Sequence, residues 1–249
     1  MKVSIITIAY NSGATIEDTI KSVVAQDYPN IEYIIIDGAS KDNTLEIVER
    51  YRDRIAVVVS EKDKGIYDAM NKGVEHATGD IIGILNSDDH YYDHTVISEV
   101  VHKFKTEHCD GLYADLIYVD RDNPEKVIRY WKSGNYTPGK FLLGWMPPHP
   151  TFFVKREIYE KYGLYSTDLR SAADYEFMLR VIHRHKITLS YMPRILTRMR
   201  VGGMSNVSLK NRWRANMEDR RAWRMNGIKP RWYTLSLKPI SKIIQFLNK

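Results

Sequence analysis

Short apolar runs rich in β-branched residues alternate with segments of helical periodicity near the start of the chain, and this alternation constrains the fold more than any other feature. The apolar runs occupy residues 3–8, 31–37, 55–60 and 81–86. The helical segments lie between them, at residues 12–26, 43–51 and 66–77. Strands that alternate with helices predict an α/β fold, with a Rossmann-like, mostly parallel sheet and helices on both faces.

The pattern changes after residue 110. Residues 111–120 and 126–134 are two β-rich runs separated by Arg121–Glu125, a spacing that predicts an antiparallel pair of strands. A proline-rich loop then leads to an expected strand at Thr151–Val154 and a helix. The next segment, "SAADYEFMLRVIHRH", predicts an amphipathic helix with Asp174 at its start, where the helix dipole stabilises a carboxylate.

Polar residues follow each expected strand of the first half. They are Tyr10 and Asn11, Asp37 and Gly38, Glu61 and Asp63, and Asp88 and Asp89. Because ligands of parallel sheets collect at the carboxyl ends of the strands, these residues are expected to line one crevice. Asp, Asn and Gly also form turns and helix caps, and we assign that role to Asp42 and Asn43.

The adjacent pair Asp88 and Asp89 needs a separate explanation. One carboxylate has a structural role open to it, capping an expected helix near His94, whereas its neighbour has none. Two hard oxygen ligands on one loop suit a Mg²⁺ or Mn²⁺ ion that also binds phosphate oxygens. The pair therefore predicts either a helix cap or a divalent metal site.

The composition is that of an ordinary globular protein, with 43% hydrophobic and 27% charged residues. A single cysteine, Cys109, excludes an internal disulfide framework and suits a reducing cytoplasm. The apolar N-terminal run stops at Asn11 without a small-residue cleavage site, so we expect a strand and not a signal peptide. No apolar run in the sequence approaches the roughly 20 residues of a membrane-spanning helix.

The C-terminal segment concentrates the positive charge. Residues 200–249 hold 12 lysines and arginines against two acidic residues, a formal charge of +10, whereas the rest of the chain carries −4. Residues 229–249 also contain Trp232, Tyr233 and, after Pro239, an apolar run that predicts a short amphipathic helix. The apolar side chains of this segment are Leu235, Leu237, Ile240, Ile243, Ile244 and Leu247. We expect the segment to lie on an anionic membrane surface, the alternative being a helix packed on the main domain with solvated basic residues.

Five motifs follow one another along the chain: "VSIITIAYN", "DGASKDNT", "DKGIYDAMNKG", "ATGDIIGILNSDD" and "HPTFFVKR". Together, and in this order, they resemble family 2 of the inverting glycosyltransferases, which have the GT-A fold and assemble bacterial surface polysaccharides. The resemblance covers about residues 1–206. It implies a nucleotide-binding half at residues 1–110 and an acceptor-binding half at residues 111–206, followed by a basic, aromatic, helical tail at residues 207–249.

This resemblance implies transfer of a sugar, with inversion, from a nucleotide-diphosphate donor to a hydroxyl of a glycan or lipid-linked glycan. UDP is the family's commonest nucleotide, and a divalent metal, Mn²⁺ or Mg²⁺, is the expected cofactor. The enzyme is expected in the cytoplasm, associated with the inner face of the cytoplasmic membrane. The sequence indicates neither the sugar nor the oligomeric state.

The resemblance also assigns roles to residues that match the nucleotide-binding motifs. Tyr10 is expected to stack on the nucleotide base, and Asp37 is expected to accept a hydrogen bond from a ring N–H of that base. Asp63, Lys64 and Gly65 are expected to form the loop over the nucleotide.

The remaining carboxylates match the catalytic motifs. Asp88 and Asp89 match the acidic motif that holds the ribose and, through the divalent metal, the diphosphate. Asp174 matches the acid that serves as general base, and plain capping of its helix is the alternative. The sequence departs from the family pattern at Asn86, where an Asp is common, and at Ala173, where an acid often precedes the base.

Arg198 and Arg200 stand near the place where many members of the family have a histidine. Because arginine binds phosphate in bidentate fashion, the two residues are expected to contact the diphosphate, which leaves the strictness of metal dependence open. His149 has two interpretations, a contact to the acceptor or a structural role in the loop around Pro147 and Pro148.

Two other classes of protein compete with this interpretation. A sugar-nucleotide pyrophosphorylase needs a glycine-rich, basic phosphate loop after the first strand, and "AYNSGATIED" has no basic residue. A nucleic-acid-binding module could use the basic tail with Trp213, Trp223 and Trp232, in line with the pI of about 9.1. The main part of the chain is negative, however, and contains no recognised nucleic-acid motif, so we expect no nucleic-acid partner.

Overall fold

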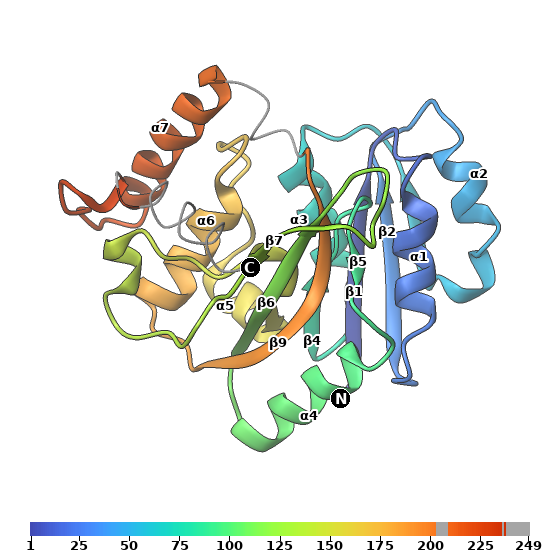
Figure 1. Ribbon diagram of the computed structural model, residues 1–249, viewed down its shortest axis with the longest axis horizontal. Coiled ribbons are helices and arrows are strands. Elements are labelled where there is room, and N and C mark those ends of the chain that lie inside the picture. The colour runs from blue at the N-terminus through green and yellow to red at the C-terminus, as the bar shows by residue number, and fades with distance from the viewer. Residues whose placement is uncertain (203–208, 236, 238–249) are drawn as a thin grey trace.

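The computed structural model describes residues 1–202, 209–235 and 237, without the side chains of residues 209–214 (Figure 1). Its sheet has nine strands in the order β3-β2-β1-β4-β8-β6-β9-β5, with β7 paired to β6. The strands are β1 (Val3–Ala9), β2 (Ile31–Asp37), β3 (Val57–Ser60), β4 (Ile81–Ile84), β5 (His90–Tyr91), β6 (Gly111–Val119), β7 (Val127–Trp131), β8 (Phe153–Lys155) and β9 (Leu189–Arg200).

Helices lie between most successive strands of the described chain, whereas loops join β4 to β5 and β6 to β7. The α-helices are α1 (Ile16–Val24), α2 (Thr44–Glu49), α3 (Ile66–His76), α4 (Val96–Glu107), α5 (Arg156–Tyr162), α6 (Ala173–Met178) and α7 (Leu209–Met225). A π-helical segment, Leu179–Arg184, continues α6. Short 3-10 turns occur at Arg52–Arg54, Lys140–Leu143 and His149–Thr151. Figure 1 places α2 and α7 at opposite ends of the molecule.

The first half confirms the predicted parallel sheet. Strand β1 pairs in parallel with β2 and β4, and β2 pairs in parallel with β3. Successive side chains of a strand point to opposite faces, so Ile34 and Ile36 pack with α3 while Tyr33 and Ile35 pack with α1 and α4. Because helices cover both faces, these strands are apolar without alternation, which is why they appear in the sequence as continuous runs.

The second half adds antiparallel strands. Strands β6 and β7 form the predicted antiparallel pair, and β8 runs antiparallel to both β4 and β6, which joins the two halves into one sheet. Strand β9 returns parallel to β6 with register shifts around Asp115 and ends beside β5. Figure 1 shows the long, curved β9 crossing next to β6.

The start of the tail packs on the main domain. Trp223 of α7 is fully buried, and its indole Nε1 donates a hydrogen bond to the hydroxyl of Tyr175 at 2.9 Å. Further on, the Thr234 hydroxyl donates to the carbonyl of Leu142 at 2.7 Å. Leu235, expected to face a membrane, is buried instead, which corrects that expectation.

The rest of the tail expectation is not tested. The amphipathic helix predicted after Pro239 lies outside the described residues. None of the helices in the described part of the chain combines the length and the apolar character needed to span a bilayer.

Candidate active site

The carboxyl ends of β1, β2 and β3 bring an aromatic ring and a carboxylate together. Ala9, Asp37 and Ser60 are neighbours across these strands, so the residues that follow them meet at one edge. A methyl group on Gly38 would lie 2.4 Å from Oδ2 of Asp63 and 3.3 Å from Cδ2 of Tyr10. The missing side chain of Gly38 therefore makes room for Asp63 beside Tyr10, whose side chain is 63% exposed. A flat, accessible ring next to a carboxylate suits a planar ligand that carries an N–H group.

Asp37 differs from Asp63 because its carboxylate is already bonded. It is completely buried. Its Oδ2 accepts hydrogen bonds from the backbone N–H of Ser40 at 3.0 Å and from the Ser60 hydroxyl at 2.7 Å, and its Oδ1 accepts one from the Ser40 hydroxyl. Asp37 therefore shapes the turn after β2, and its expected role as the contact to the nucleotide base stays a prediction.

The loop at 63–65 leads directly into α3. Oδ1 of Asp63 accepts a hydrogen bond from the backbone N–H of Gly65 at 2.9 Å, and the N–H of Lys64 donates to Asp68 at 3.0 Å. Gly65 has a φ of +122°, a conformation that side chains disfavour, and it is the residue before the first turn of α3. The side chain of Lys64 is exposed, as a loop over a ligand requires.

The two adjacent carboxylates after β4 have different environments. Asp89 is buried, and its two oxygens accept hydrogen bonds from the backbone N–H of Arg200 at 3.3 Å and from Asn86 Nδ2 at 3.2 Å. Asp88 is only partly buried, and its carboxylate accepts no hydrogen bond from another residue within the described ranges. Burial raises the pKa of Asp88, with the charges of Arg200 and Arg121 opposing it. Burial and the charge of Asp88 raise the pKa of Asp89 well above its ordinary value.

Both arginines expected at a diphosphate are bonded to protein groups in this structure. Arg200 is buried and donates hydrogen bonds to the carboxylate of Asp18 in α1 at 2.5 Å and to the carbonyl oxygen of Asp88 at 2.9 Å. It therefore links α1 to the acidic loop, residues 86–89. Arg198 donates to Glu125 at 3.1 Å and lies 4.9 Å from the ring centroid of Tyr92.

The oxygen atoms of the acidic loop fit a divalent cation. Oδ1 of Asn86 is buried without a hydrogen-bond partner, and the neighbouring Asp88 carboxylate is open. Within the described residues, no group of three His, Cys, Asp or Glu side chains forms a complete metal shell. Mg²⁺ and Mn²⁺ are commonly bound by one or two protein oxygens plus substrate phosphates, so this donor set suits a cation that arrives with a diphosphate.

Asp174 lies in the first turn of α6 and is partly exposed. Its Oδ1 accepts a hydrogen bond from the hydroxyl of Tyr67 at 2.9 Å. Asp174 is not the N-cap residue, which is Ala172, and no side chain makes a capping hydrogen bond, but Asp174 does lie in the first turn, where the helix dipole favours a carboxylate. The Asp174 carboxylate is therefore available to a ligand, and a tyrosine of α3 holds it.

His149 lies in the same neighbourhood. Its ring packs edge to face on Tyr165, with 6.1 Å between the ring centroids. Burial lowers the pKa of His149, although the negative charge of Asp174 opposes the shift, so the imidazole is neutral at pH 7. A neutral imidazole near a carboxylate can exchange hydrogen bonds with a sugar hydroxyl.

Several residues of this site were not found from the sequence. Tyr67 lies in the motif "DKGIYDAMNKG", but it occupies a buried helix position that periodicity assigns to the core. Asp18 partners Arg200 from a distant helix, and the hydroxyls of Ser12 and Ser87 join the first and fourth strand ends at 2.7 Å. A hydroxyl-bearing aromatic at an otherwise apolar position was the one available signal, for Tyr67.

Comparisons with known proteins extend this picture. Residues 4–163 match the model of glycosyl transferase family 2. An uncharacterised glycosyltransferase of Mycobacterium tuberculosis is 35% identical over 180 residues, which are 72% of this chain and 68% of that protein. Escherichia coli WfaP, a UDP-Glc:alpha-D-GlcNAc-diphosphoundecaprenol beta-1,3-glucosyltransferase, is 39% identical over 121 residues, 48% of this chain and 47% of that protein.

Two solved structures have the same fold. Staphylococcus aureus TarS 1-349 in complex with UDP-GlcNAc superposes with a TM-score of 0.69 at 18% identity, over 91% of this chain and 65% of that chain. The mannosyltransferase PcManGT of Pyrobaculum calidifontis, in complex with GDP-Man and Mn²⁺, gives a TM-score of 0.66 at 17% identity, over 100% of this chain and 76% of that chain. The chain thus spans less than two thirds of the TarS fragment, and at these identities the likeness concerns the fold.

Proposed function

The chain belongs to glycosyl transferase family 2, an inverting family with the GT-A fold, and we propose that it transfers a sugar from a UDP-sugar to a hydroxyl of a lipid-linked glycan in surface polysaccharide synthesis. The observation that carries the proposal is that two partly exposed carboxylates follow the carboxyl ends of the parallel strands, Asp63 beside Tyr10 and Asp88 after β4. WfaP, by its name, uses UDP-Glc and a diphosphoundecaprenol-linked acceptor, which supports this choice of donor and acceptor.

The family excludes the pyrophosphorylase alternative, and the structure weakens the nucleic-acid alternative. Trp223, one of three tryptophans that a nucleic-acid surface would use, is fully buried. A buried indole cannot stack on a base.

The nucleotide base stacks on Tyr10 in this proposal, and Asp63 accepts a hydrogen bond from the ring N–H. Asp63, and not Asp37, is the acceptor at the base in this proposal, because Oδ2 of Asp63 lies beside Tyr10, whereas Asp37 is completely buried and already accepts three hydrogen bonds. Lys64 and Gly65 cover the nucleotide from the loop before α3.

Asp88 would hold a divalent cation when the donor is bound, and Oδ1 of Asn86 would supply a second oxygen. PcManGT, which has the same fold, was solved in complex with GDP-Man and Mn²⁺, which supports the use of a divalent metal. The expectation that Asp88 and Asp89 both bind the metal is not tested. In this proposal Asp88 is the ligand, and Asp89 positions Asn86 and the backbone N–H of Arg200 through the hydrogen bonds that its two oxygens accept. When bound, the cation neutralises charge on the leaving nucleoside diphosphate as a Lewis acid. The nearby guanidinium of Arg200, under the loop, adds positive charge to the same region.

Asp174 is the general base. Its carboxylate takes the proton of the acceptor hydroxyl while the hydroxyl oxygen attacks the anomeric carbon of the donor. The bond from that carbon to the diphosphate breaks on the opposite face, which inverts the anomeric configuration. His149, near Asp174, contacts the acceptor.

A membrane surface fits the junction between the main domain and the tail. Trp232 is 92% exposed, and the neighbouring Lys229 and Arg231 are also exposed. The bond from Thr234 to Leu142 brings this segment next to Leu143, which is 55% exposed. Apolar side chains flanked by cations suit an anionic lipid headgroup layer, where each basic residue contributes about 1 kcal/mol.

Sedimentation with lipid vesicles tests the membrane proposal. We expect the full chain to bind vesicles of anionic lipid more tightly than neutral ones, and Trp232→Ala to weaken binding several-fold. Val127→Ala, which removes an exposed apolar side chain from β7, is the matched control and should bind like the wild type. Equal binding of wild type and Trp232→Ala would contradict the proposal.

A screen of nucleotide sugars tests the catalytic proposal. Nucleotide release is measured with UDP-, GDP- and dTDP-sugars, with Mn²⁺ or with chelator, in the presence of polyprenyl-diphosphate-linked sugars. We expect turnover with a UDP-sugar, and Mn²⁺ to increase it. Absence of both binding and turnover with every UDP-sugar would overturn the proposed donor.

A further inference from the structure

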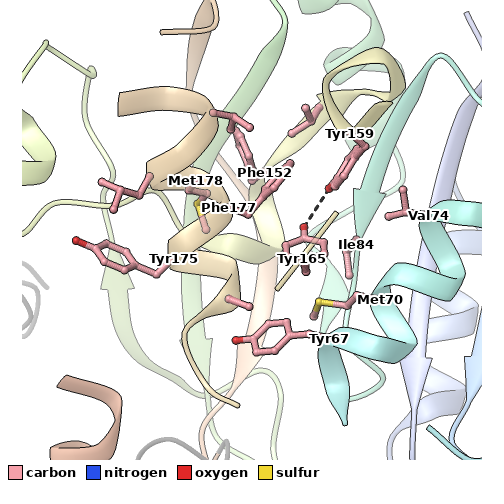
Figure 2. Packing of buried hydrophobic residues seen from close by; sticks show 14 of the residues in the cluster. Tyr67, Met70, Val74, Ile84, Phe152, Tyr159, Tyr165, Tyr175, Phe177 and Met178 are labelled. Carbon is pink, nitrogen blue, oxygen red and sulfur yellow. Dashed lines mark hydrogen bonds between the residues drawn. The ribbon is translucent and has the colours of Figure 1, made fainter. Parts of the chain in front are cut away.

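Helix α3 connects the nucleotide loop to the proposed general base. Gly65 ends the loop, and Tyr67 follows two residues later in the first turn of the helix. The hydroxyl of Tyr67 donates a hydrogen bond to Oδ1 of Asp174 at 2.9 Å, across 107 residues of sequence. Figure 2 shows Tyr67 at the end of α3, lying toward the start of α6.

The hydroxyl of Tyr67 is suited to act as a hydrogen-bond donor in a fixed position. Its side chain is only 7% exposed. Burial raises the pKa of Tyr67 well above its ordinary value, and the negative charge of Asp174 adds to the shift. The hydroxyl therefore keeps its proton at neutral pH and can only donate to the charged carboxylate.

Surrounding contacts restrain both partners. The ring of Tyr67 stacks on Tyr165 with 6.1 Å between centroids and 26° between planes. One helical turn after Tyr67, Asn71 bonds the backbone of Tyr165 twice, to its carbonyl and from its N–H, both at 2.9 Å. The same face of α3 thus holds the segment that leads into α6 by its aromatic ring and by its backbone.

We propose that Tyr67 is a positioning residue, which orients the carboxylate of Asp174 so that Oδ2 faces the acceptor hydroxyl. Within the described residues, Tyr67 is the one side chain that donates a hydrogen bond to Asp174. Because the loop Asp63–Gly65 and Tyr67 share one short stretch, the nucleotide loop and the residue that orients the base are both carried by the N-terminal end of α3. This inference rests on the proposed function, since it gives Asp174 the role of base.

The alternative is that Tyr67 is an ordinary core residue whose buried hydroxyl found a partner. The two roles differ in whether the hydroxyl matters to catalysis through Asp174. A double-mutant cycle measures this directly, because a role through Asp174 must disappear when Asp174 is replaced.

The cycle consists of the wild type, Tyr67→Phe, Asp174→Asn and the double variant. Tyr67→Phe should lower kcat by about 10- to 100-fold, the size of a lost bond to a charged group, while donor KM stays within about twofold. In the Asp174→Asn background the same change should have no further effect on kcat. Tyr159→Phe is the matched control, because it removes another buried hydroxyl of this cluster, bonded to Tyr165 at 3.0 Å, and it should leave kcat unchanged.

Urea unfolding of the same four proteins supplies a readout that needs no substrate. The two substitutions should be coupled by about tenfold in the unfolding equilibrium constant. Additive effects on kcat, or a kcat for Tyr67→Phe equal to that of the wild type, would overturn the positioning role. A wild type without transfer activity that still shows the unfolding coupling would count against the proposed function and not against the Tyr67–Asp174 contact.

Discussion

Two carboxylates at opposite ends of the parallel strands, Glu32 and Asp88, have opposite surroundings. At the amino end, Glu32 of β2 accepts hydrogen bonds from Lys2 Nζ at 2.5 Å, from the Ser4 hydroxyl at 2.6 Å, and from the N–H and hydroxyl of Thr78 at 2.7 Å each. At the carboxyl end, the side chain of Asp88 accepts none from other residues of the described chain. Both carboxylates are at least partly buried, but the protein donates hydrogen bonds to Glu32 and not to Asp88.

The direction of each pKa shift depends on the balance between burial and hydrogen-bond donors. Burial raises the pKa of Glu32, yet hydrogen bonds from Lys2, Ser4 and Thr78 outweigh it and bring the pKa down to about 2. Burial raises the pKa of Asp88 and Asp89, and too few donors oppose it. Glu32, which holds the fold together, is thus satisfied by donors of the protein, whereas Asp88 in the site is left for a cation or a substrate to complete.

The largest expected effect on catalysis is at Asp174. Its carboxylate accepts one side-chain hydrogen bond, whereas Glu32 accepts four hydrogen bonds. Asp174→Asn keeps the shape and loses the proton acceptor, so kcat should fall by about 10²- to 10⁴-fold with donor binding retained. Steady-state kinetics and UDP-sugar titration measure the two quantities. A wild-type rate in this variant would mean that Asp174 has a structural role, like Glu32, and not a catalytic one.

The next effect separates the adjacent pair. Asp88→Asn should weaken Mn²⁺-dependent UDP binding by about 100-fold, since a metal ligand is lost, without lowering stability. Asp89→Ala should instead lower the free energy of unfolding by about 1 to 3 kcal/mol, because it leaves Asn86 and the N–H of Arg200 without their acceptor. Calorimetric titration and urea unfolding check the pair, and a stability loss in Asp88→Asn would contradict the division of roles.

A comparable effect, on stability alone, is expected at the amino end. Glu32→Gln should lower the free energy of unfolding by about 3 kcal/mol at pH 7, the value of a pKa lowered from 4.5 to about 2. A lowered pKa stabilises the fold above the unfolded value and loses its effect as the pH falls. The difference from the wild type should therefore shrink between pH 4.5 and pH 2. Urea unfolding across this range tests it, and a pH-independent difference would show that charge is not the cause.

The smallest effect concerns the nucleotide base. Asp63→Ala removes one hydrogen-bond acceptor beside Tyr10, so UDP affinity should fall by about tenfold. Gly38→Ala should weaken binding in the same direction by displacing the Asp63 carboxylate, without altering any charge. Glu61→Ala is the control, because this exposed residue pairs with Lys72 at the surface. Unchanged UDP affinity in Asp63→Ala would contradict the proposal that Asp63 accepts a hydrogen bond from the base.

The sequence by itself determined the parallel half of the fold and which strand ends carry polar residues. Apolar runs covered on both faces, such as Ile31–Asp37, are visible without a structure because burial on two sides removes alternation. The family motifs also named Tyr10, Asp88 and Asp174, since each follows a fixed sequence context.

Only the tertiary structure decided which of these carboxylates are open. The sequence does not distinguish Asp37 from Asp63. In the structure, Ser40 and Ser60 donate hydrogen bonds to the carboxylate of Asp37, while Gly38 leaves room for the carboxylate of Asp63 beside Tyr10. In the same way, helical periodicity places Tyr67 in the core and gives no sign that its hydroxyl reaches Asp174, 107 residues away. The physical reason is that the pKa and accessibility of a carboxylate depend on the donors that the fold brings to it, and those donors come from segments distant in sequence.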